Sequence, residues 1–411
     1  MHKTRKIIVT LLTSLFLLPI ILQTTAIVES NNKHLFLVIN NSFTLKDNLS
    51  DKEINFLMRL GHIPSLSACI IKNNSVVWYR GYGHSKLLIR QKPTIDTIYP
   101  IACITKTVTA TALMTLYDKG LFGLDDDVND YLDFKVRNPN YPDTPITFRM
   151  LLAHQSSLGG LDLPKHYLIN CYKKNKNDYP YPMIKELITP NGSLYIPKVW
   201  LNIPPGSDCE YTSIDIILLE HLIEVLSKQK FIDYCKKNIF NPLNMSNTGF
   251  HVKDFKRSLL AISYLSVCGL YFRLPFTEGV YGWAGLRTSI EDLSHFIIAH
   301  MNKGVWNGVR ILNESTVEMM HTPQYPNSTC FDNNPERYGL GWIIWMNDSS
   351  GIIFYGHAGL GIGMTTGLFI NNSNDWALLF FINKYVDMTK KIEREVYVKI
   401  INDLLFKARD F

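Results

Sequence analysis

A cysteine and a lysine stand three positions apart near the start of an apolar segment. They are Cys103 and Lys106, in "IACITKTVTATALMTLYDKG", residues 101–120. On a helix, residues three apart share a face, so the two side chains can approach each other. A helix N-terminus and a nearby ammonium both favour a thiolate, which would make this cysteine reactive. Taken alone, the pair fits better with a small buried cysteine and a solvated lysine, because buried inert cysteine is common.

Two later segments carry further groups that could take part in proton transfer. Tyr211 precedes a long apolar run in "PPGSDCEYTSIDIILLEHLIE", residues 204–224, where a phenol could relay a proton or simply pack. His357 and Gly359 lie in "YGHAGLGIGMTTGLFI", residues 355–370, in a strand-like context. Glycine within a strand often marks the close approach of another backbone or of a ligand. Singly, each of these features is more typical of structure than of function.

Together and in this order, the segments resemble the penicillin-recognising hydrolase superfamily. That group includes class C β-lactamases, D-alanyl-D-alanine carboxypeptidases, related esterases and the β-lactamase-related proteins of animals. Its S-x-x-K element appears here as "CITK", its Y-x-N as "YTS" and its K-T-G or H-x-G as "HAG". Secondary signatures also match, including "GLFGLDDDVNDYL", "ITFRMLLAHQSSL", "AGLRTSIEDLSHF" and "YGLGW". The resemblance extends from about Leu45 to Phe406.

The resemblance implies roles for individual residues. Position 103 would be the acylated nucleophile, and Lys106 would help to remove its proton. Tyr211 would be the second proton-transfer group, and His357 would line the opposite wall of the cleft. The implied reaction is acyl transfer through a covalent intermediate followed by hydrolysis, without a metal or organic cofactor.

Substrate-binding positions follow from the same resemblance. The backbone N–H groups of Cys103 and Leu360, next to Gly359, would form an oxyanion hole for a tetrahedral intermediate. Ser213 occupies the place of the asparagine that contacts the substrate amide in relatives. The implied partner is a small molecule or peptide with an ester or amide carbonyl. Replacing asparagine by the shorter Ser213 removes an amide donor and acceptor, which favours simple esters over peptides and β-lactams.

Cysteine in place of serine leaves two functional hypotheses open. In the first, the chain is a hydrolase of the esterase, amidase or D-amino-acid peptidase type that uses Cys103. In the alternative, it is a catalytically weak or inactive relative whose cleft serves as a binding or scaffolding module. Sulfur is larger than oxygen, and a displaced nucleophile can cost about a hundredfold in rate. Retention of Lys106, Tyr211 and His357 favours the hydrolase. A purely structural secreted protein would not explain this retained polar set.

The elements that must position these residues can be read from the apolar spacing. Strand-like runs occur at both ends of the chain, and a helix- and loop-rich region lies between them. This arrangement predicts an α/β (α+β) fold with a sheet built from N- and C-terminal segments, flanked by helices and with an inserted helical region. The resemblance implies that the sheet is antiparallel and that the fold is of the β-lactamase/transpeptidase-like type. The single domain would span 45–411, with its α/β part at about 45–98 and 282–411 and its helical part at about 99–281.

Individual elements follow from the same patterns. Gly120 is the expected C-cap of the helix that follows Cys103. The other expected helices are 45–60, two consecutive helices within 213–240, 290–304 and 389–408. The expected strands are a hairpin within 65–83 and the runs 338–346, 351–359, 365–372 and 375–383.

The N-terminal segment differs from the rest of the chain. Residues 1–26 combine a basic start, an apolar middle and small residues at the end, which predicts a signal peptide and a secreted protein. The apolar run 7–28 approaches the length of a membrane span, so an uncleaved anchor is the alternative. Residues 27–44 would form a linker.

Charge and cysteine content narrow the class of protein. The net charge is +6, of which Lys3, Arg5 and Lys6 contribute three, leaving 6 − 3 = +3 over the rest of the chain. Nucleic-acid binding therefore has little support. Seven cysteines, none at CxxC spacing, argue against a zinc knuckle, and in an exported protein an odd number leaves at least one thiol unpaired.

Overall fold

The computed structural model describes residues 49–159, 184–267, 269–274, 281–328, 330, 336–347, 351–371, 373 and 375–411. The predicted signal or anchor segment (1–26) and linker (27–44) lie outside these residues. Within the described part of the chain, no helix combines the length and apolar character needed to cross a bilayer.

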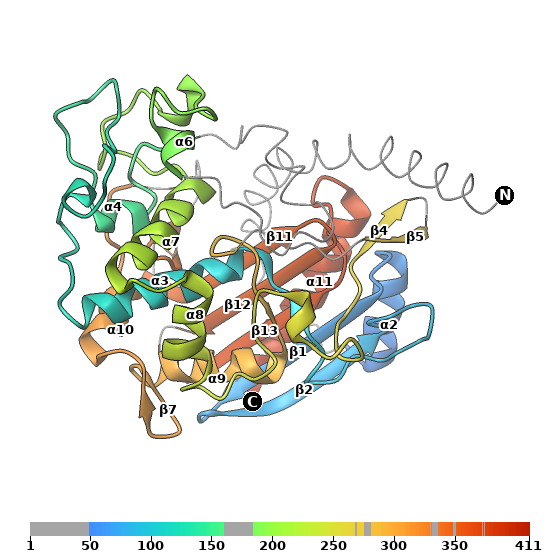
Figure 1. Cartoon of the computed structure of the whole chain (residues 1–411). Coiled ribbons are helices and arrows are strands. Elements are labelled where there is room, and N and C mark those ends of the chain that lie inside the picture. Colours follow the sequence, from blue (N-terminus) through green and yellow to red (C-terminus); the bar gives the residue numbers. More distant parts are fainter. Residues whose placement is uncertain are drawn as a thin grey trace.

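The centre of the fold is a seven-stranded antiparallel sheet with the order β2-β1-β13-β12-β11-β10-β9 (Figure 1). The first two strands come from the N-terminal part of the chain and the other five from the last third, which confirms the predicted sheet. Its strands are β1 (Ser65–Lys72), β2 (Ser75–Gly83), β9 (Glu336–Tyr338), β10 (Ile343–Asn347), β11 (Gly351–Gly361), β12 (Met364–Asn371) and β13 (Trp376–Ile382). Three two-stranded pairs are added by β3 (Tyr99–Pro100) with β6 (Arg287–Thr288), β4 (Tyr264–Val267) with β5 (Leu270–Arg273), and β7 (Val305–Trp306) with β8 (Val309–Arg310).

Alternating side chains of the central strands feed two separate hydrophobic cores. On β13, Leu379 and Phe381 join the core that contains α3 (Thr105–Tyr117) and α9 (Ile290–Met301). Leu378 and Phe380 join the core that contains α2 (Asp51–Leu60) and α11 (Lys391–Asp410). A strand places successive side chains on opposite faces, so a strand buried on both sides reads as the unbroken apolar run "WALLFFI". The sheet is therefore the middle layer of three (Figure 1).

The helical region carries the residues of greatest chemical interest. Its central helix, α3 (Thr105–Tyr117), is buried from Thr105 through Leu116. Its threonines can be buried because their hydroxyls bond to carbonyls within the helix, as Thr107 does to Ile104 at 2.8 Å and Thr111 to Thr107 at 2.8 Å. The other helices are α2 (Asp51–Leu60), α4 (Phe148–Leu152), α6 (Ile184–Ile188), α7 (Ser213–Ser227), α8 (Phe231–Cys235), α9 (Ile290–Met301), α10 (Glu314–Met320) and α11 (Lys391–Asp410). Shorter turns are η1 (Ala102–Ile104), η2 (Val128–Asp130), η3 (Pro197–Val199), η4 (Lys236–Phe240) and η5 (Val252–Asp254).

Two expected boundaries can be compared with the structure. The helix after Cys103 ends at Tyr117, with Asp118 as the capping residue at its boundary. The expected glycine, Gly120, closes this end at φ +68°, because its N–H donates to the Tyr117 carbonyl at 2.8 Å and the Leu121 N–H donates to the Leu116 carbonyl at 3.2 Å. The run 338–346 is not one strand, because Gly341 at φ +77° turns the chain between β9 and β10. A side chain at Gly341 would also meet Ala110 Cβ at 2.3 Å, so this turn packs directly on α3.

Candidate active site

Cys103 lies in the turn η1, between β3 and α3, and the backbone around it is held from two sides. The N–H of Ile101 donates to the Leu286 carbonyl at 3.1 Å, and the Thr366 hydroxyl donates to the Ile101 carbonyl at 3.0 Å. Ala102 has φ +48°, a left-handed conformation that costs energy for a residue with a side chain. The backbone just before the candidate nucleophile is therefore strained and fixed by its surroundings.

Lys106, the second residue of α3, is a buried cation that faces Cys103. Only 1% of it is exposed, and its Nζ donates to the Trp283 carbonyl at 3.0 Å. Burial lowers the pKa of Lys106, and the charge of a Cys103 thiolate and a hydrogen bond to that sulfur oppose this shift. Among the described residues, no carboxylate forms an ion pair with Lys106. Its partner of opposite charge would be the thiolate.

Tyr211 and Ser213 lie at the start of α7. The ring of Tyr211 lies 5.1 Å from Lys106 Nζ, so this phenol belongs to the same cluster. Thr212 caps the helix by accepting the Ile214 N–H at 3.2 Å, which fixes the chain between the two residues. Ser213 is buried as the first residue of α7, and no hydrogen bond between its side chain and Cys103 or Lys106 is present among the described residues.

His357 and its neighbours on β11 form the wall opposite Tyr211. The two rings lie 6.2 Å apart. His357 Nδ1 lies 2.6 Å from the Ala358 carbonyl, which can only accept, so Nδ1 carries the proton and the buried Nε2 is left without a hydrogen-bond partner among the described residues. Burial and then the charge of Lys106 lower the pKa of His357 to about 3. The imidazole is therefore neutral at physiological pH.

The end of β11 lies directly against the turn that carries Cys103. A Cβ on Gly359 would be 2.5 Å from the Ile101 carbonyl oxygen, so only glycine permits this approach. β10 pairs with β11 only as far as Gly356, whereas β12 pairs with it through Gly361. The segment from His357 to Gly361, which includes Leu360, therefore pairs with one strand only.

Two residues of this cluster were not singled out in the sequence. His154 packs edge-on against Tyr211 and against Tyr338, with ring centroids 4.9 Å apart in each case. Its Nδ1 lies 2.9 Å from Asp215 Oδ2, while its buried Nε2 has no partner among the described residues. Burial lowers the pKa of His154 and raises that of Asp215, so the pair is neutral or shares one proton. His154 lies in the signature "LLAHQSSL" and Tyr338 in the signature "YGLGW", but neither spacing nor composition assigned these two residues a role.

Tyr338 brings a second phenol to the cluster. Its hydroxyl is buried without a partner among the described residues, and burial, then Glu336 and Cys103, raise the pKa of Tyr338. Its ring lies 4.9 Å from that of His154 and 6.0 Å from that of Tyr211, which places it in the same cluster. His154, Tyr338 and His357 thus each present a buried, unsatisfied polar atom around Tyr211 and Lys106. Such atoms are costly unless water or a ligand satisfies them.

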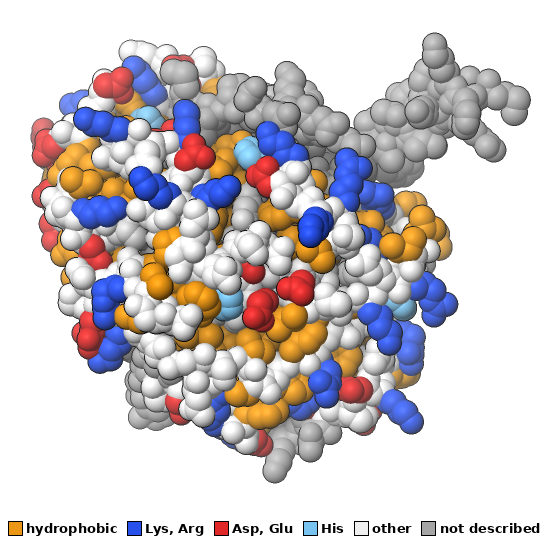
Figure 2. All heavy atoms as spheres, turned by 60° about the horizontal axis from the view of Figure 1, so that its bottom comes forward, with side chains coloured by type: hydrophobic (Ala, Val, Ile, Leu, Met, Phe, Trp, Pro, Cys, Tyr) orange, Lys and Arg blue, Asp and Glu red, His pale blue; other side chains and the backbone are white. Residues whose placement is uncertain are grey.

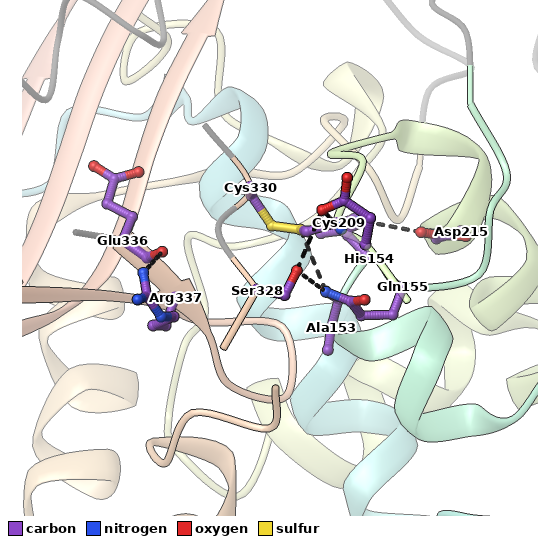
Figure 3. The surroundings of a disulfide bond; sticks show 10 residues. Ala153, His154, Gln155, Cys209, Asp215, Ser328, Cys330, Glu336 and Arg337 are labelled. Atoms are coloured by element: carbon purple, nitrogen blue, oxygen red, sulfur yellow. Dashed lines mark hydrogen bonds and ion pairs between the residues drawn. A yellow bond between two sulfur atoms is a disulfide. The ribbon is translucent and has the colours of Figure 1, made fainter. Parts of the chain in front are cut away.

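A disulfide fixes the chain next to Tyr211. Cys209 is bonded to Cys330, 121 positions later, and Figure 3 shows this bond beside His154 and Asp215. Cys209 Sγ also lies 3.7 Å from the Ala153 carbonyl, and Gln155 donates to Ser328 at 2.8 Å. The loops before α7 and before β9 are therefore tied together, and with them the segments that carry Tyr211 and Tyr338.

The remaining described cysteines differ sharply in their surroundings. Cys69 and Cys235 are buried, and burial raises the pKa of both thiols, whereas Cys103 is partly exposed. Of the free thiols that the structure describes, Cys103 is thus the one that a reagent can reach. The described residues contain no group of three or more His, Cys, Asp or Glu side chains placed to hold a metal ion.

The geometry can be compared with that of known proteins. The family profile described as "Beta-lactamase" matches residues 51–402. Protein flp of Staphylococcus aureus (strain N315) is 26% identical over 358 residues, covering 86% of this chain and 66% of that protein. β-Lactamase-like protein 2 of Dictyostelium discoideum is 25% identical, covering 87% of this chain and 64% of that protein. The chain thus spans slightly less than two thirds of either relative.

Solved structures show the same fold. An octameric penicillin-binding protein homologue from Pyrococcus abyssi has a TM-score of 0.72 and 26% identity, covering 87% of this chain and 76% of that one. A D-amino acid amidase from Ochrobactrum anthropi SV3 has a TM-score of 0.66 and 18% identity, covering 87% and 99%.

Proposed function

The chain belongs to the β-lactamase family, and on this premise we propose that it is an acyl-transferring hydrolase that uses Cys103 as its nucleophile. The observation that carries the proposal is the environment of Lys106. This lysine is buried, Cys103 raises its pKa against the effect of burial, and no carboxylate among the described residues forms an ion pair with it. A lysine with a lowered pKa and no competing anion can accept the thiol proton and then stabilise the thiolate.

The proposed reaction has two steps, acylation of Cys103 and hydrolysis of the thioester. The Cys103 thiol gives its proton to Lys106, and the thiolate attacks the carbonyl carbon of an ester or amide. The tetrahedral intermediate collapses to a thioester, and the alcohol or amine leaves with a proton delivered from Lys106 through Tyr211. Water then attacks the thioester, gives up one proton to the same groups, and releases the acid and the free thiol.

The oxyanion that forms in each step requires hydrogen-bond donors. The backbone N–H groups of Cys103 and Leu360 are the proposed pair. The contact of Gly359 with the Ile101 carbonyl supports this, because it brings the end of β11 against η1. Ser213, at the start of α7, would contact the acyl group.

The polarity of the wall supports a neutral substrate. His357 stands where many relatives have a lysine, and its lowered pKa means that it brings no positive charge to the wall. A substrate carboxylate would gain little there, whereas the N–H of an amide could donate a hydrogen bond to the unprotonated Nε2. The structural likeness to a D-amino acid amidase makes amino-acid amides and esters the first compounds to test.

Intact-mass measurement tests the proposal directly. The chain is incubated with an activated ester, an amino-acid amide and a penicillin, alongside Cys103→Ser and the matched control Cys103→Ala. We expect the wild type to gain the mass of the acyl group from the ester, and Cys103→Ala to gain none. Acylation of Cys103→Ser with an inert wild type would instead mean that the cleft has lost its nucleophile. No acylation in any variant would favour a binding module.

A further inference from the structure

The hairpin β4–β5 presents an apolar face to solvent. Its register pairs Leu265 with Phe272 and Val267 with Leu270, so these four side chains share one face. Val267, Leu270 and Phe272 are 43%, 64% and 51% exposed. An isolated two-stranded hairpin is only marginally stable in water, and one with an exposed apolar face is a candidate for contact with a partner.

The opposite face anchors the hairpin to the domain. Tyr264 lies on that face and is buried, and its hydroxyl accepts the Leu87 N–H at 2.8 Å. This contact places the loop 84–92 beside the hairpin. The same loop exposes Leu88 at 95% and Ile89 at 66%, so the hairpin and the neighbouring loop both carry exposed apolar side chains.

Positive charge surrounds these apolar side chains. The segments 84–92 and 256–274 contain no Asp or Glu, and their Lys and Arg residues number six: Lys86, Arg90, Lys92, Lys256, Arg257 and Arg273. Lys86 ties the two segments together, because its Nζ donates to the carbonyls of Arg257 at 2.8 Å and Ser258 at 2.9 Å. In Figure 2, hydrophobic side chains gather with Lys and Arg beside them at the right edge, the side on which Figure 1 places β4 and β5.

We propose that the surface formed by β4–β5 and the loop 84–92 docks on an anionic lipid bilayer. Protruding aliphatic and aromatic side chains within a ring of Lys and Arg match the two attractions of such a surface, apolar insertion and charge. A second copy of the chain would bring the same six positive charges face to face. The N-terminal residues 1–26 carry three Lys or Arg and no acid, so they lack the complementary charge.

An uncleaved anchor, the alternative to a signal peptide, would give this docking a geometric basis. Between the apolar run 7–28 and Leu49, the first described residue, lie 20 residues, which span at most about 70 Å when extended. A domain held by such an anchor stays within reach of the bilayer. The hairpin then meets lipid at a high effective concentration, so weak contacts are enough for docking. The proposal concerns orientation at the membrane and does not depend on the chemistry at Cys103.

Photo-crosslinking from lipid tests the docking in the full chain. Vesicles of phosphatidylcholine with phosphatidylglycerol carry a photoactivatable phosphatidylglycerol, and labelled peptides are mapped by mass spectrometry. We expect label in peptides covering 258–273, at least tenfold more than with phosphatidylcholine vesicles that carry a photoactivatable phosphatidylcholine instead. Because an anchor would label only its own peptides, this readout separates the hairpin from residues 1–48.

Matched variants complete the test. Leu270→Ser/Phe272→Ser and, separately, Arg90→Gln/Arg257→Gln should each reduce the labelling of 258–273 by tenfold or more. Val309→Ser/Ile392→Ser removes two side chains that are 41% and 55% exposed elsewhere and should leave the labelling unchanged. Unchanged melting temperatures show that each variant is folded. Label confined to residues 1–48, or equal loss in the control variant, overturns the proposal.

Discussion

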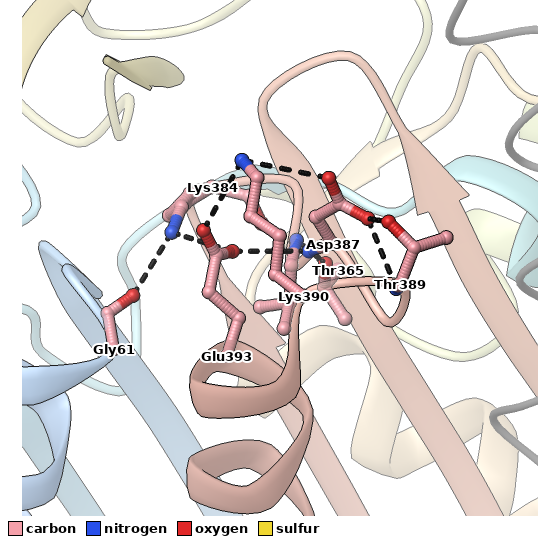
Figure 4. A network of polar contacts seen from close by, with 8 residues as sticks. Gly61, Thr365, Lys384, Asp387, Thr389, Lys390 and Glu393 are labelled. Atoms are coloured by element: carbon pink, nitrogen blue, oxygen red, sulfur yellow. Dashed lines mark hydrogen bonds and ion pairs between the residues drawn. The ribbon is translucent and has the colours of Figure 1, made fainter. Parts of the chain in front are cut away.

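Two buried lysines show how differently the chain uses the same side chain. Lys106 in the active site is 1% exposed and Lys384 near the start of α11 is 3% exposed, and burial lowers the pKa of both. Lys384 donates to Glu393 at 2.8 Å and to the Gly61 carbonyl at 2.9 Å (Figure 4). Lys106 has a carbonyl, aromatic rings and a thiol around it. The presence of a carboxylate thus separates a structural ion pair from a lysine that can exchange its proton with a neighbour.

The surroundings of the two lysines also differ in how well their polar groups are satisfied. Glu393 accepts from Lys384 and from the Asp387 N–H at 3.0 Å, and Asp387 in turn accepts from Thr389. Around Lys106, by contrast, His154 Nε2, His357 Nε2 and the Tyr338 hydroxyl have no hydrogen-bond partner among the described residues. A completed network stabilises the fold, whereas an incomplete one leaves atoms for a substrate or for water.

Replacing each lysine by methionine should separate these two roles, and the larger effect belongs to the active site. Lys106→Met should slow acylation by about 10²–10⁴-fold, the usual contribution of a positioned acid–base group. Stability should be unchanged or higher, because the variant no longer buries an ammonium without a carboxylate. Stopped-flow acylation with an activated ester and urea unfolding measure the two effects. Acylation at the wild-type rate would show that Lys106 does not activate Cys103.

Lys384→Met should have the reverse effect. Breaking this pair leaves Glu393 with the exposed Lys390 at 3.6 Å and the Asp387 N–H at 3.0 Å, and should cost about 1.5–3 kcal/mol in the free energy of unfolding, the scale of a lost hydrogen bond to a charged group. The acylation rate of the folded fraction should not change. Lys384→Met/Glu393→Leu removes both charges and should recover most of the stability, since well-packed apolar pairs replace buried ion pairs at little cost. Failure of the double variant to recover would mean that packing, not charge, makes Lys384 important.

The sheet and the residues around Lys106 could be predicted from the sequence. Strands at both ends and helices between them follow from local apolar patterns, and the sheet confirms them. The order "CITK", "YTS", "HAG" located residues that the structure indeed brings together, namely Cys103, Lys106, Tyr211 and His357. Their chemical roles remain proposals, because position alone does not show reactivity.

What the sequence could not predict depends on contacts between distant positions. His154 and Asp215 are 61 positions apart, and Cys209 and Cys330 are 121 apart. Neither pair has a local pattern, because folding brings together segments that lie far apart in the sequence. Gly341 divides a run whose pattern predicts a single strand. The glycine is needed where the chain packs against α3, and this contact is again between segments far apart in the sequence.

Acidification should destabilise the surroundings of Lys106 at a higher pH than the surroundings of Lys384. The pKa of His357 is about 3 in the folded chain against 6.5 unfolded, so the unfolded chain binds the extra proton first and stability falls as pH drops below 6.5. At pH 5 this histidine alone should cost about 2 kcal/mol. Near Lys384, the pKa of Asp387 is lowered in the folded chain from its usual 3.8. The carboxylate of Asp387 therefore stabilises the fold until the pH falls below 3.8.

Hydrogen exchange at pH 7 and pH 5 checks this order. After correction for intrinsic exchange rates, protection should fall in peptides covering β11 and α3 and persist in peptides covering α11. His357→Gln should reduce the loss on β11. Uniform loss of protection across both sides would contradict the assignment of neutral, buried histidines to the active site.

The smallest expected effect comes from single unsatisfied hydroxyls. Tyr338→Phe should slow acylation about tenfold, the scale of one hydrogen bond to a substrate, while stability stays the same because the hydroxyl has no partner to lose among the described residues. Tyr355→Phe is the matched control: its hydroxyl is also buried without such a partner, but its ring stacks on His321 at 4.0 Å. It should leave acylation unchanged. If both variants have the same steady-state kcat and KM, then the Tyr338 hydroxyl has no more part in the reaction than the Tyr355 hydroxyl. In that case only the neighbouring Cys103 distinguishes the active-site Lys106 from the structural Lys384.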